Sequence, residues 1–251
     1  MAHDSDTPAV SIRKLSKAFG AQKVLDGIDL NVSRGETLTV LGRSGTGKSV
    51  LLKLIIGLQK PDGGSIEIFG QDVTRLATDE LNQIRKRIGF LFQHAALYDS
   101  LTVEENVAFP LRRHTPMKDD EIRDRVRDLL ARVGMEKDLK KMPADISGGM
   151  KKRVGLARAL ALDPEIMLLD EPTAGLDPIT TEEIDELIQG LHRERDITAV
   201  VVTHDLLSVK RLADRIVMLR DGHVVAEGEP EEIRHSNDPF VADFMQAGGQ
   251  E

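Results

Sequence analysis

The chain has no cysteine in its 251 residues. This absence excludes a disulfide framework, a thiolate metal site and a cysteine nucleophile. Positive charge is not in excess either, since 34 Lys and Arg stand against 42 Asp and Glu and give a formal net charge of -8. Because a protein that binds duplex nucleic acid neutralises phosphates with an excess of cations, we expect no nucleic-acid partner.

Long apolar runs are absent as well. No run approaches the ~20 apolar residues that span a bilayer, and the polar, acidic start Met1–Pro8 lacks the pattern of a signal peptide. We therefore expect a cytoplasmic chain that reaches a membrane only through a partner. No Pro/Gly/Ser-rich linker and no repeated block divides the sequence, so one compact unit with two lobes is predicted.

The first part of the chain is rich in β-forming residues. Short β-rich runs are separated by turn residues at Gly20, Asp26-Gly27 and Arg34-Gly35, which predicts an antiparallel β lobe around a central strand. A helical segment rich in apolar residues follows the central strand directly and ends at Gly57. The β-rich runs are residues 10–15, 27–32, 37–42 and 66–69.

The second part alternates between helical and strand-like patterns. From Glu165 onward, strand-like runs alternate with helical stretches, which is typical of an α/β fold with a parallel sheet covered on both faces. A last short helix is predicted after Asp238-Pro239 and through Met245. The strand-like runs are 166–170, 197–204 and 215–225, and one predicted helix places Ile122, Val126, Leu129, Leu130 and Val133 on a single face.

Eight consecutive residues form a phosphate-binding motif. Residues 42–49 fit G-x-x-x-x-G-K-[ST], with a strand before and a helix after, as the motif requires. The backbone N–H groups and the helix dipole would face phosphate, Lys48 would neutralise β/γ-phosphate charge, and the Ser49 hydroxyl would reach Mg²⁺. An ordinary glycine turn between a strand and a helix would not require Lys48 and Ser49 at its end. The fingerprint G-x-G-x-x-G is absent, which disfavours a nicotinamide or flavin enzyme.

Two carboxylates end a later apolar run. Residues 166–169 are apolar and lead into Asp170 and Glu171. Because successive side chains of a strand point to opposite sides, one carboxylate could serve a metal and the other a water molecule. Asp170 would hold Mg²⁺ through its water shell, and Glu171 would orient and polarise the attacking water. Alone, the pair could be a simple strand exit; with the phosphate loop it indicates a nucleoside triphosphatase.

A serine and two glycines precede the acidic strand, in Ile146-Ser147-Gly148-Gly149-Met150. At the start of a helix they would form an anion site, although a capped helix start explains them equally well. Here the chain resembles the ABC ATPase family, whose signature is usually written LSGGQ. The resemblance implies a P-loop fold with a RecA-like core, an antiparallel β subdomain and an inserted α-helical subdomain.

Other segments resemble further elements of this family in the right order. Gln93, Asp177 and His204 match the Q-loop, the D-loop and the switch histidine, and Phe19 matches the adenine-stacking aromatic residue. Met150 departs from the usual glutamine, so it is left out of the site. The resemblance implies ATP and Mg²⁺ as cofactors, with Glu171, His204 and Lys48 as catalytic residues. It implies that Mg²⁺ is bound by Ser49, Gln93 and Asp170. The residues that it implies for nucleotide binding are Phe19, Val24, Arg43, Ser44, Gly45, Thr46, Gly47, Lys48, Ser49, Val50, Gln93, Ser147, Gly148, Gly149 and Asp177.

The resemblance also implies a domain plan and a dimer. Two copies would bind head to tail, so that ATP held by Lys48 of one copy meets Ser147 and Gly149 of the other. The expected boundaries are a flexible N-terminus at 1–8 and one ABC ATPase domain at 9–251, divided into a core with its β subdomain (9–93 and 162–235), a helical subdomain with the signature (94–161) and a C-terminal tail (236–251).

Three runs narrow the resemblance to the ATPase of MCE-type phospholipid transporters, the Mla system and its relatives: residues 47–62, 91–115 and 146–180. This implies a location on the inner face of the cell membrane, a multi-spanning permease contacted by residues 94–107, an MCE lipid-binding protein, and often a small STAS-domain protein.

Three alternatives stay open. A soluble ABC ATPase of DNA repair or translation generally fuses two cassettes or carries a long coiled coil, and this chain has neither. The ATPase of a polar amino-acid or metal importer would share every catalytic motif and differ in the segment that faces the permease. An inactive, ATP-binding regulatory module is disfavoured because Lys48, Ser49, Asp170, Glu171 and His204 are all present.

Overall fold

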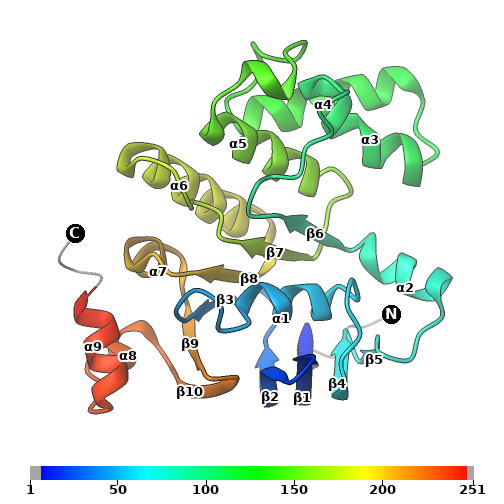
Figure 1. Ribbon diagram of the computed structural model, residues 1–251. Helices are drawn as coiled ribbons and strands as arrows, with labels where there is room; N and C mark the ends of the chain where they lie inside the picture. The colour runs from blue at the N-terminus through cyan, green and yellow to red at the C-terminus, as the bar shows by residue number, and fades with distance from the viewer. Residues whose placement is uncertain (1–6, 248–251) are drawn as a thin grey trace.

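The computed structural model describes residues 7–247 and contains two sheets with helices between and around them (Figure 1). Residues 1–6 of the predicted flexible N-terminus (1–8) and residues 248–251 of the predicted tail (236–251) lie outside the described residues. A four-stranded sheet has the order β2-β1-β4-β5, and a six-stranded sheet has the order β10-β9-β3-β8-β7-β6. The molecule is therefore an α/β protein, as the sequence predicts.

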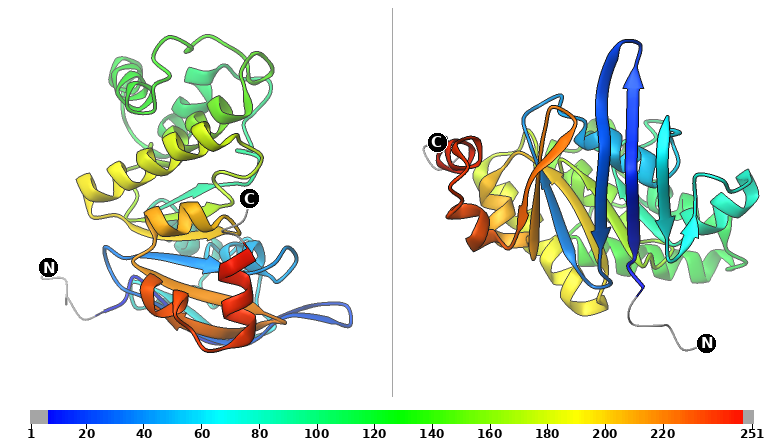
Figure 2. Two further views of the ribbon diagram at one scale, coloured as in Figure 1. Left: turned by 90° about the vertical axis from the view of Figure 1, so that its left-hand side faces the viewer. Right: turned by 90° about the horizontal axis from the view of Figure 1, so that it is seen from below.

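The four-stranded sheet is antiparallel, and its β1–β2 hairpin projects from the rest of the molecule (Figure 2). The prediction of a turn at Asp26-Gly27 is wrong, because β2 runs through both residues. Gly27 has φ 71, and the pairing of β1 with β2 shifts register nearby, so the glycine supports a bulge and not a chain reversal. The strands are β1 (Val10–Phe19), β2 (Gln22–Val32), β4 (Gly63–Ile68) and β5 (Gln71–Asp72).

The six-stranded sheet is parallel except at one edge. The predicted single run 215–225 is in fact two strands, because Asp221 (φ 49) and Gly222 (φ 81) turn the chain and β10 pairs antiparallel with β9. The central strand β3 pairs with β8 and β9. The strands are β3 (Thr37–Leu41), β6 (Ile88–Leu91), β7 (Ile166–Asp170), β8 (Thr198–Thr203), β9 (Arg215–Arg220) and β10 (His223–Gly228).

The two faces of the parallel sheet belong to different cores. Val200 and Val202 of β8 join the core that contains the antiparallel sheet and α1 (Lys48–Ile55). Their neighbours Ala199 and Val201 join the core that contains α5 (Gly148–Ala159) and α6 (Pro178–Arg195). Because side chains alternate along a strand, an uninterrupted apolar run indicates a sheet covered on both faces, as predicted.

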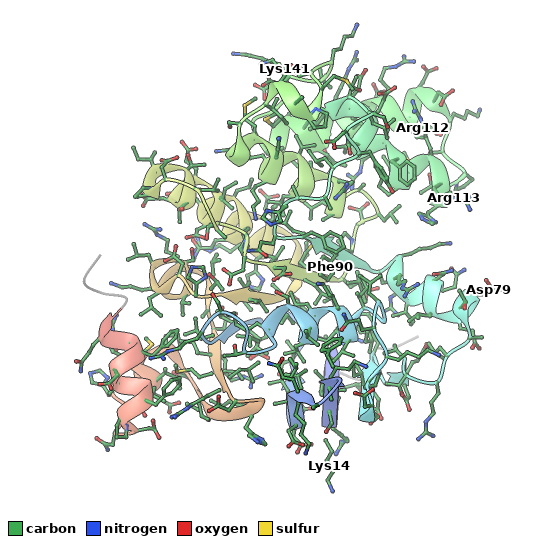
Figure 3. The ribbon with its side chains drawn as sticks, viewed as in Figure 1. Lys14, Asp79, Phe90, Arg112, Arg113 and Lys141 are labelled. Atoms are coloured by element: carbon green, nitrogen blue, oxygen red, sulfur yellow. The ribbon has the colours of Figure 1, made fainter. Side chains whose placement is uncertain are left out.

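Helices α3 (Val103–His114), α4 (Asp119–Arg132) and α5 pack together at one end of the molecule (Figure 1). The prediction of one apolar face on α4 is confirmed, because Ile122, Val126, Leu129 and Leu130 are all buried. A short 3-10 helix, Pro143–Asp145, leads from this group into α5. Figure 3 shows Phe90 at strand β6 below these helices, Arg112 at α3, and Lys141 at the top of the group.

The remaining helices lie around the edges of the two sheets. A third, smaller core joins Leu41, Ile216 and Met218 to apolar residues of α7, α8 and α9. The last helix ends at Ala247, two residues beyond the prediction. Within residues 7–247 no helix has both the length and the apolar character needed to cross a bilayer. These helices are α2 (Thr78–Arg85), α7 (Leu206–Leu212), α8 (Pro230–Arg234) and α9 (Pro239–Ala247).

Candidate functional site

The phosphate loop connects the buried strand β3 to helix α1. Gly47 precedes α1 with φ 96, and a Cβ added there would lie 2.8 Å from a side-chain carbon of Val24. Only glycine therefore fits both the left-handed backbone and the close approach of β2. Arg43, Ser44 and Gly45 are exposed at the open side of the loop, in reach of a ligand at the start of α1.

Lys48 lies buried at the first position of α1. Its Nζ donates hydrogen bonds to the carbonyl oxygens of Gly42 (2.7 Å) and Arg43 (3.1 Å), and it lies 3.8 Å from Oε1 of Glu171. Burial lowers the pKa of the Lys48 ammonium, while the carboxylates of Glu171 and Asp170 act to raise it. The loop thus carries an ammonium group held against its own backbone.

Ser49 and Asp170 meet although 121 positions separate them in the chain. The Ser49 hydroxyl donates a 2.7 Å hydrogen bond to Oδ1 of Asp170 at the end of β7. Burial raises the pKa of Asp170, and the hydrogen bond from Ser49 opposes that shift. A hydroxyl and a carboxylate are hard oxygen donors of the kind that Mg²⁺ takes from proteins, with its other positions left to water and phosphate, so this pair fits the ion.

Glu171 follows β7 in a left-handed conformation, with φ 47, and its N–H donates to the carbonyl of Val202 at 2.8 Å. The expectation that Asp170 and Glu171 point to opposite sides of one strand is wrong, because β7 ends at Asp170 and the backbone turns at Glu171. This turn brings both carboxylates to the phosphate loop. A left-handed backbone at a non-glycine residue stores strain of the kind found at functional sites.

His204 follows β8, whose carboxyl end lies beside that of β7. Its Nδ1 lies 2.9 Å from Oε2 of Glu171, and the imidazole is 57% exposed. Glu171 therefore lies between an ammonium group on one side and an imidazole on the other. By contrast, Nδ1 of His192 lies 2.7 Å from the carbonyl of Ile197 within the fold, which is a structural role.

The signature segment begins helix α5. The Ser147 hydroxyl accepts a hydrogen bond from the N–H of Met150 at 3.2 Å, so it caps the helix in this conformation. Gly149 packs against the start of α6, where a Cβ added to it would lie 2.6 Å from Cγ2 of Thr180. Asp177 caps α6 and accepts from the Thr180 hydroxyl at 2.6 Å, a hydrogen bond that lowers the pKa of the carboxyl.

The predicted residues thus fall into separate groups. Lys48, Ser49, Asp170, Glu171 and His204 are brought together. Ser147, Gly148, Gly149 and Asp177 form a second group at α5 and α6, and no hydrogen bond or ion pair among residues 7–247 joins it to the phosphate loop.

The remaining predicted residues lie at the edge of the site. Phe19 is at the end of β1, 47% exposed, with the Lys17 ammonium 5.5 Å from its ring centroid. Val24 and Val50 pack partly buried against the main core, and Val24 adjoins Gly47. The Gln93 side chain is exposed, while its carbonyl oxygen accepts a hydrogen bond from Lys152. No contact among the described residues joins the Gln93 side chain to Ser49 or Asp170.

Lys152 is a residue of the site that the motifs do not reveal. It lies on α5, three positions after Gly149, and is only 4% exposed. Its Nζ also donates to the carbonyl oxygen of Glu171 at 2.7 Å. The available signal is its spacing, because a lysine four positions before Leu156 falls on the buried face of the helix.

An apolar groove of about 400 Å³ opens next to the segment after Gln93. Tyr98 and Phe109 are both partly exposed there, 47% and 42%, and their rings lie 4.8 Å apart between centroids. Polar groups at the groove come from His114 and Arg158, and the rest of the lining is apolar: Ile88, Gly89, Phe90, Phe92, Ala96, Pro110, Ala159 and Leu162.

Comparison with known proteins gives a consistent family match. The family model described as "ABC transporter" matches residues 25–174. The chain is 44% identical over 237 residues to the "Probable ribonucleotide transport ATP-binding protein mkl" of Mycobacterium leprae, covering 94% of this chain and 68% of that protein. It is 44% identical over 226 residues to the "Methionine import ATP-binding protein MetN" of Caulobacter vibrioides, covering 89% of this chain and 68% of the relative. The chain therefore spans about two thirds of the length of these relatives. It spans 66% of the length of the mkl protein of Mycobacterium tuberculosis.

Solved structures give the same result. The dimeric structure of the ATP-binding cassette MJ0796 in a post-hydrolysis state, bound to ADP and Pi, has a TM-score of 0.82 and is 37% identical, covering 88% of this chain and 98% of that one. The structure of cbiO1 from Clostridium perfringens, described as part of the ABC transporter complex cbiONQ, has a TM-score of 0.83 and 30% identity, covering 97% of this chain and 98% of that one.

Proposed function

Because this chain belongs to the ABC transporter family and is an ATP-hydrolysing subunit of that family, we propose that Lys48, Glu171 and His204 carry its ATP hydrolysis. The observation that carries this proposal is the position of Glu171, with Lys48 Nζ 3.8 Å from one carboxylate oxygen and His204 Nδ1 2.9 Å from the other.

Each group has a separate part in the reaction. Glu171 accepts a proton from a water molecule as the water oxygen bonds to the γ-phosphorus and the bond to the leaving ADP oxygen breaks. Lys48 holds β- and γ-phosphate oxygens once they replace its contacts with Gly42 and Arg43. His204 fixes the orientation of the Glu171 carboxylate through Nδ1.

We propose that the Ser49 hydroxyl would bind Mg²⁺ directly, that Asp170 would hold the ion through its water shell, and that the Gln93 amide oxygen would be a further ligand. The bound ion would neutralise charge on the phosphate oxygens. The support is the direct hydrogen bond between Ser49 and Asp170 beside the loop.

Glu171→Gln tests the assignment of the base. Glutamine keeps the size of the side chain but does not take a proton from water, so we expect turnover to fall ~100-fold or more while ATP binding survives. An ATP-bound dimer should then persist in size-exclusion chromatography. Glu186→Gln, on the exposed face of α6, is the matched control. Turnover of Glu171→Gln within about twofold of the wild type would refute the role.

We propose a head-to-tail homodimer. The signature group lies apart from its own phosphate loop, so Ser147 and Gly149 would meet the nucleotide held by a second copy. The two dimeric MJ0796 structures, which are 37% and 36% identical to this chain, support this arrangement. Exposure of Ser147 and Gly148 at the start of α5 leaves this surface accessible to such a partner.

We further propose that the groove beside Tyr98 and Phe109 receives a multi-spanning membrane permease, which would hold the chain at the inner face of the cell membrane. The support is the apolar lining with partly exposed aromatic residues, which suits a short amphipathic segment of a partner. Two residues of the groove, Ala96 and Tyr98, also belong to the segment after Gln93, where family resemblance puts the permease contact.

The cargo that we propose is phospholipid, moved between membranes of the cell envelope with an MCE-type system and a STAS-domain protein as partners. The support is the resemblance of residues 47–62, 91–115 and 146–180 to ATPases of such systems. A methionine importer is the second candidate, because several relatives at 41–44% identity are named methionine import ATP-binding proteins.

Purification of the tagged chain from native membranes separates these candidates. Mass spectrometry should find a permease together with an MCE-domain protein and phospholipid, because the three would leave the membrane as one complex. Copurification of a methionine-binding protein with a permease, and no MCE protein, would overturn the phospholipid proposal in favour of the importer.

A further inference from the structure

We infer that Lys152 is a positioning residue that fixes Gln93 and Glu171 relative to each other. It thereby links the carboxylate of Glu171 to the segment that follows Gln93 and lines the groove with Ala96 and Tyr98, called the groove segment below. The inference rests on the proposed role of Glu171 as the base. Its starting point is one side chain from α5 that bonds to the backbone of two segments far apart in sequence, after β6 and after β7.

The contacts of Lys152 are the first argument. Its Nζ donates to the carbonyl oxygen of Gln93 and, at 2.7 Å, to that of Glu171. An ammonium group has three N–H donors and no acceptor, so one lysine can hold two carbonyl oxygens at a fixed separation. The side chain is buried, so water cannot replace either bond.

The charge of Lys152 belongs to the catalytic cluster. Burial lowers the pKa of its ammonium to about 8, and the carboxylates of Asp170 and Glu171 act to raise it. An ammonium donor makes stronger hydrogen bonds to carbonyl oxygens than a neutral donor does. A cation at this place also stabilises two carboxylates that lie close to each other.

The strain of the segments it holds is the second argument. Glu171 has φ 47, and Ala95 and Ala96, just after Gln93, have φ 58 and 46. Left-handed backbone at non-glycine residues persists only where surrounding contacts fix it. Lys152 provides such a contact beside Glu171 and beside Gln93.

Helix α5 holds the groove segment at a second point. Arg158, two turns after Lys152, donates to the carbonyl oxygens of Ala95 (2.6 Å) and Ala96 (2.7 Å). Arg158 and Ala96 both line the groove. A partner that shifts this segment would therefore shift α5, and Lys152 would carry the displacement to the backbone of Glu171.

Lys152→Met tests the inference on the full chain with MgATP as substrate. Methionine fills a similar volume but donates no hydrogen bond, so the Glu171 backbone loses its support while the phosphate loop stays intact. We expect kcat to fall ~10-fold or more, with KM and the affinity for a fluorescent ATP analogue within about twofold of the wild type. Lys151→Met, the neighbouring residue on the same helix, is the matched control and should keep wild-type kcat.

A purely structural role would appear differently, as a lower melting temperature or a smaller fraction of protein that binds nucleotide. Lys152→Gln keeps two N–H donors and should keep a larger share of kcat than Lys152→Met; it also serves as the test if the methionine variant does not fold. Wild-type kcat in both variants, or a loss of nucleotide affinity as large as the loss of kcat, would overturn the inference. Glu171→Gln is measured in parallel, so failure of the proposed base is distinguished from failure of the positioning role.

Discussion

At the scale of single residues, a further buried carboxylate, Asp185, lies outside the cluster of Lys48, Asp170 and Glu171. Asp185 of α6 is fully buried and accepts a 2.8 Å hydrogen bond from the Ser208 hydroxyl, and Arg211 lies 3.4 Å away. Oδ1 of Asp185 has no hydrogen-bond partner within residues 7–247. Ser208 also lies 3.3 Å from the Thr173 hydroxyl, so the cluster joins the segment after Glu171 to the helix after His204.

Asp185 should make stability depend on pH. Burial raises its pKa to about 6, with Asp205 also raising it and Ser208 and Arg211 opposing the shift. The folded state therefore binds the proton more tightly than the unfolded state, so this group lowers the free energy of unfolding as pH rises from about 4 to about 6. Above about pH 6, the amount by which Asp185 lowers the free energy of unfolding stays constant.

We predict that Asp185→Asn removes this dependence. Relative to the wild type, its free energy of unfolding should rise by ~1 kcal/mol between pH 5 and pH 7.5, measured by urea denaturation at both values. Asp124→Asn, on the exposed face of α4, controls for the loss of one negative charge. A difference between Asp185→Asn and wild type that is equal at the two pH values would contradict the prediction.

At the scale of elements, α3 and the segment after β6 form the apolar groove. Phe109 contributes an exposed ring that contacts Tyr98 and little of the protein's core. α3 also continues past Pro110, and Asn106 ties its first turn to the groove segment by bonding to Tyr98 at 2.8 Å. The groove segment is thus tied to α3, and the rings of Tyr98 and Phe109 are accessible to a partner.

We predict that Phe109→Ser separates the chain from its permease. The change removes apolar surface from the groove and leaves the phosphate loop untouched, so copurification of membrane protein should be lost while the ATPase activity of the isolated chain stays at the wild-type level. Leu58→Ser, which also removes an exposed apolar side chain, should keep the permease bound. Retention of the permease by Phe109→Ser would place the docking surface elsewhere.

At the scale of the whole molecule, the residues of the site are divided between two hydrophobic cores. The phosphate loop and α1 belong with the first core, whereas α5 and α6, which carry the signature and Asp177, belong with the second. One chain therefore presents two half-sites on different parts of its surface. A head-to-tail dimer would join each half to its complement.

Coexpression of two inactive variants tests this geometry. Lys48→Ala should lose ATP affinity and Ser147→Arg should block the signature face, so each alone should be inactive. In a mixed dimer the Ser147→Arg copy still has Lys48 and meets an intact Ser147 on its partner. Half of the dimers then carry one working site, which predicts about a quarter of wild-type ATPase activity. No recovery in the isolated mixed dimer would show that the site does not span two copies.

The local sequence already determined the phosphate loop, the acidic strand end and the family, because these depend on residues that are adjacent in the chain. The strand, loop and helix at residues 37–55 follow from such local patterns, and so does the buried face of α4. Local patterns mispredict the structure at Gly27. An Asp-Gly pair is equally consistent with a turn and with a bulge, and in the structure Gly27 supports a bulge inside β2.

Which side chains meet depends on how distant segments of the chain pack together. Ser49 reaches Asp170 and His204 reaches Glu171 because β3, β8 and β7 are parallel neighbours, whose carboxyl ends lie at one edge of the sheet. The left-handed turn at Glu171 and the two carbonyl bonds of Lys152 have no local signature, since they depend on how α5 packs on the ends of two strands. Adjacent residues therefore predict the chemistry of the site, whereas the packing of distant segments sets its geometry.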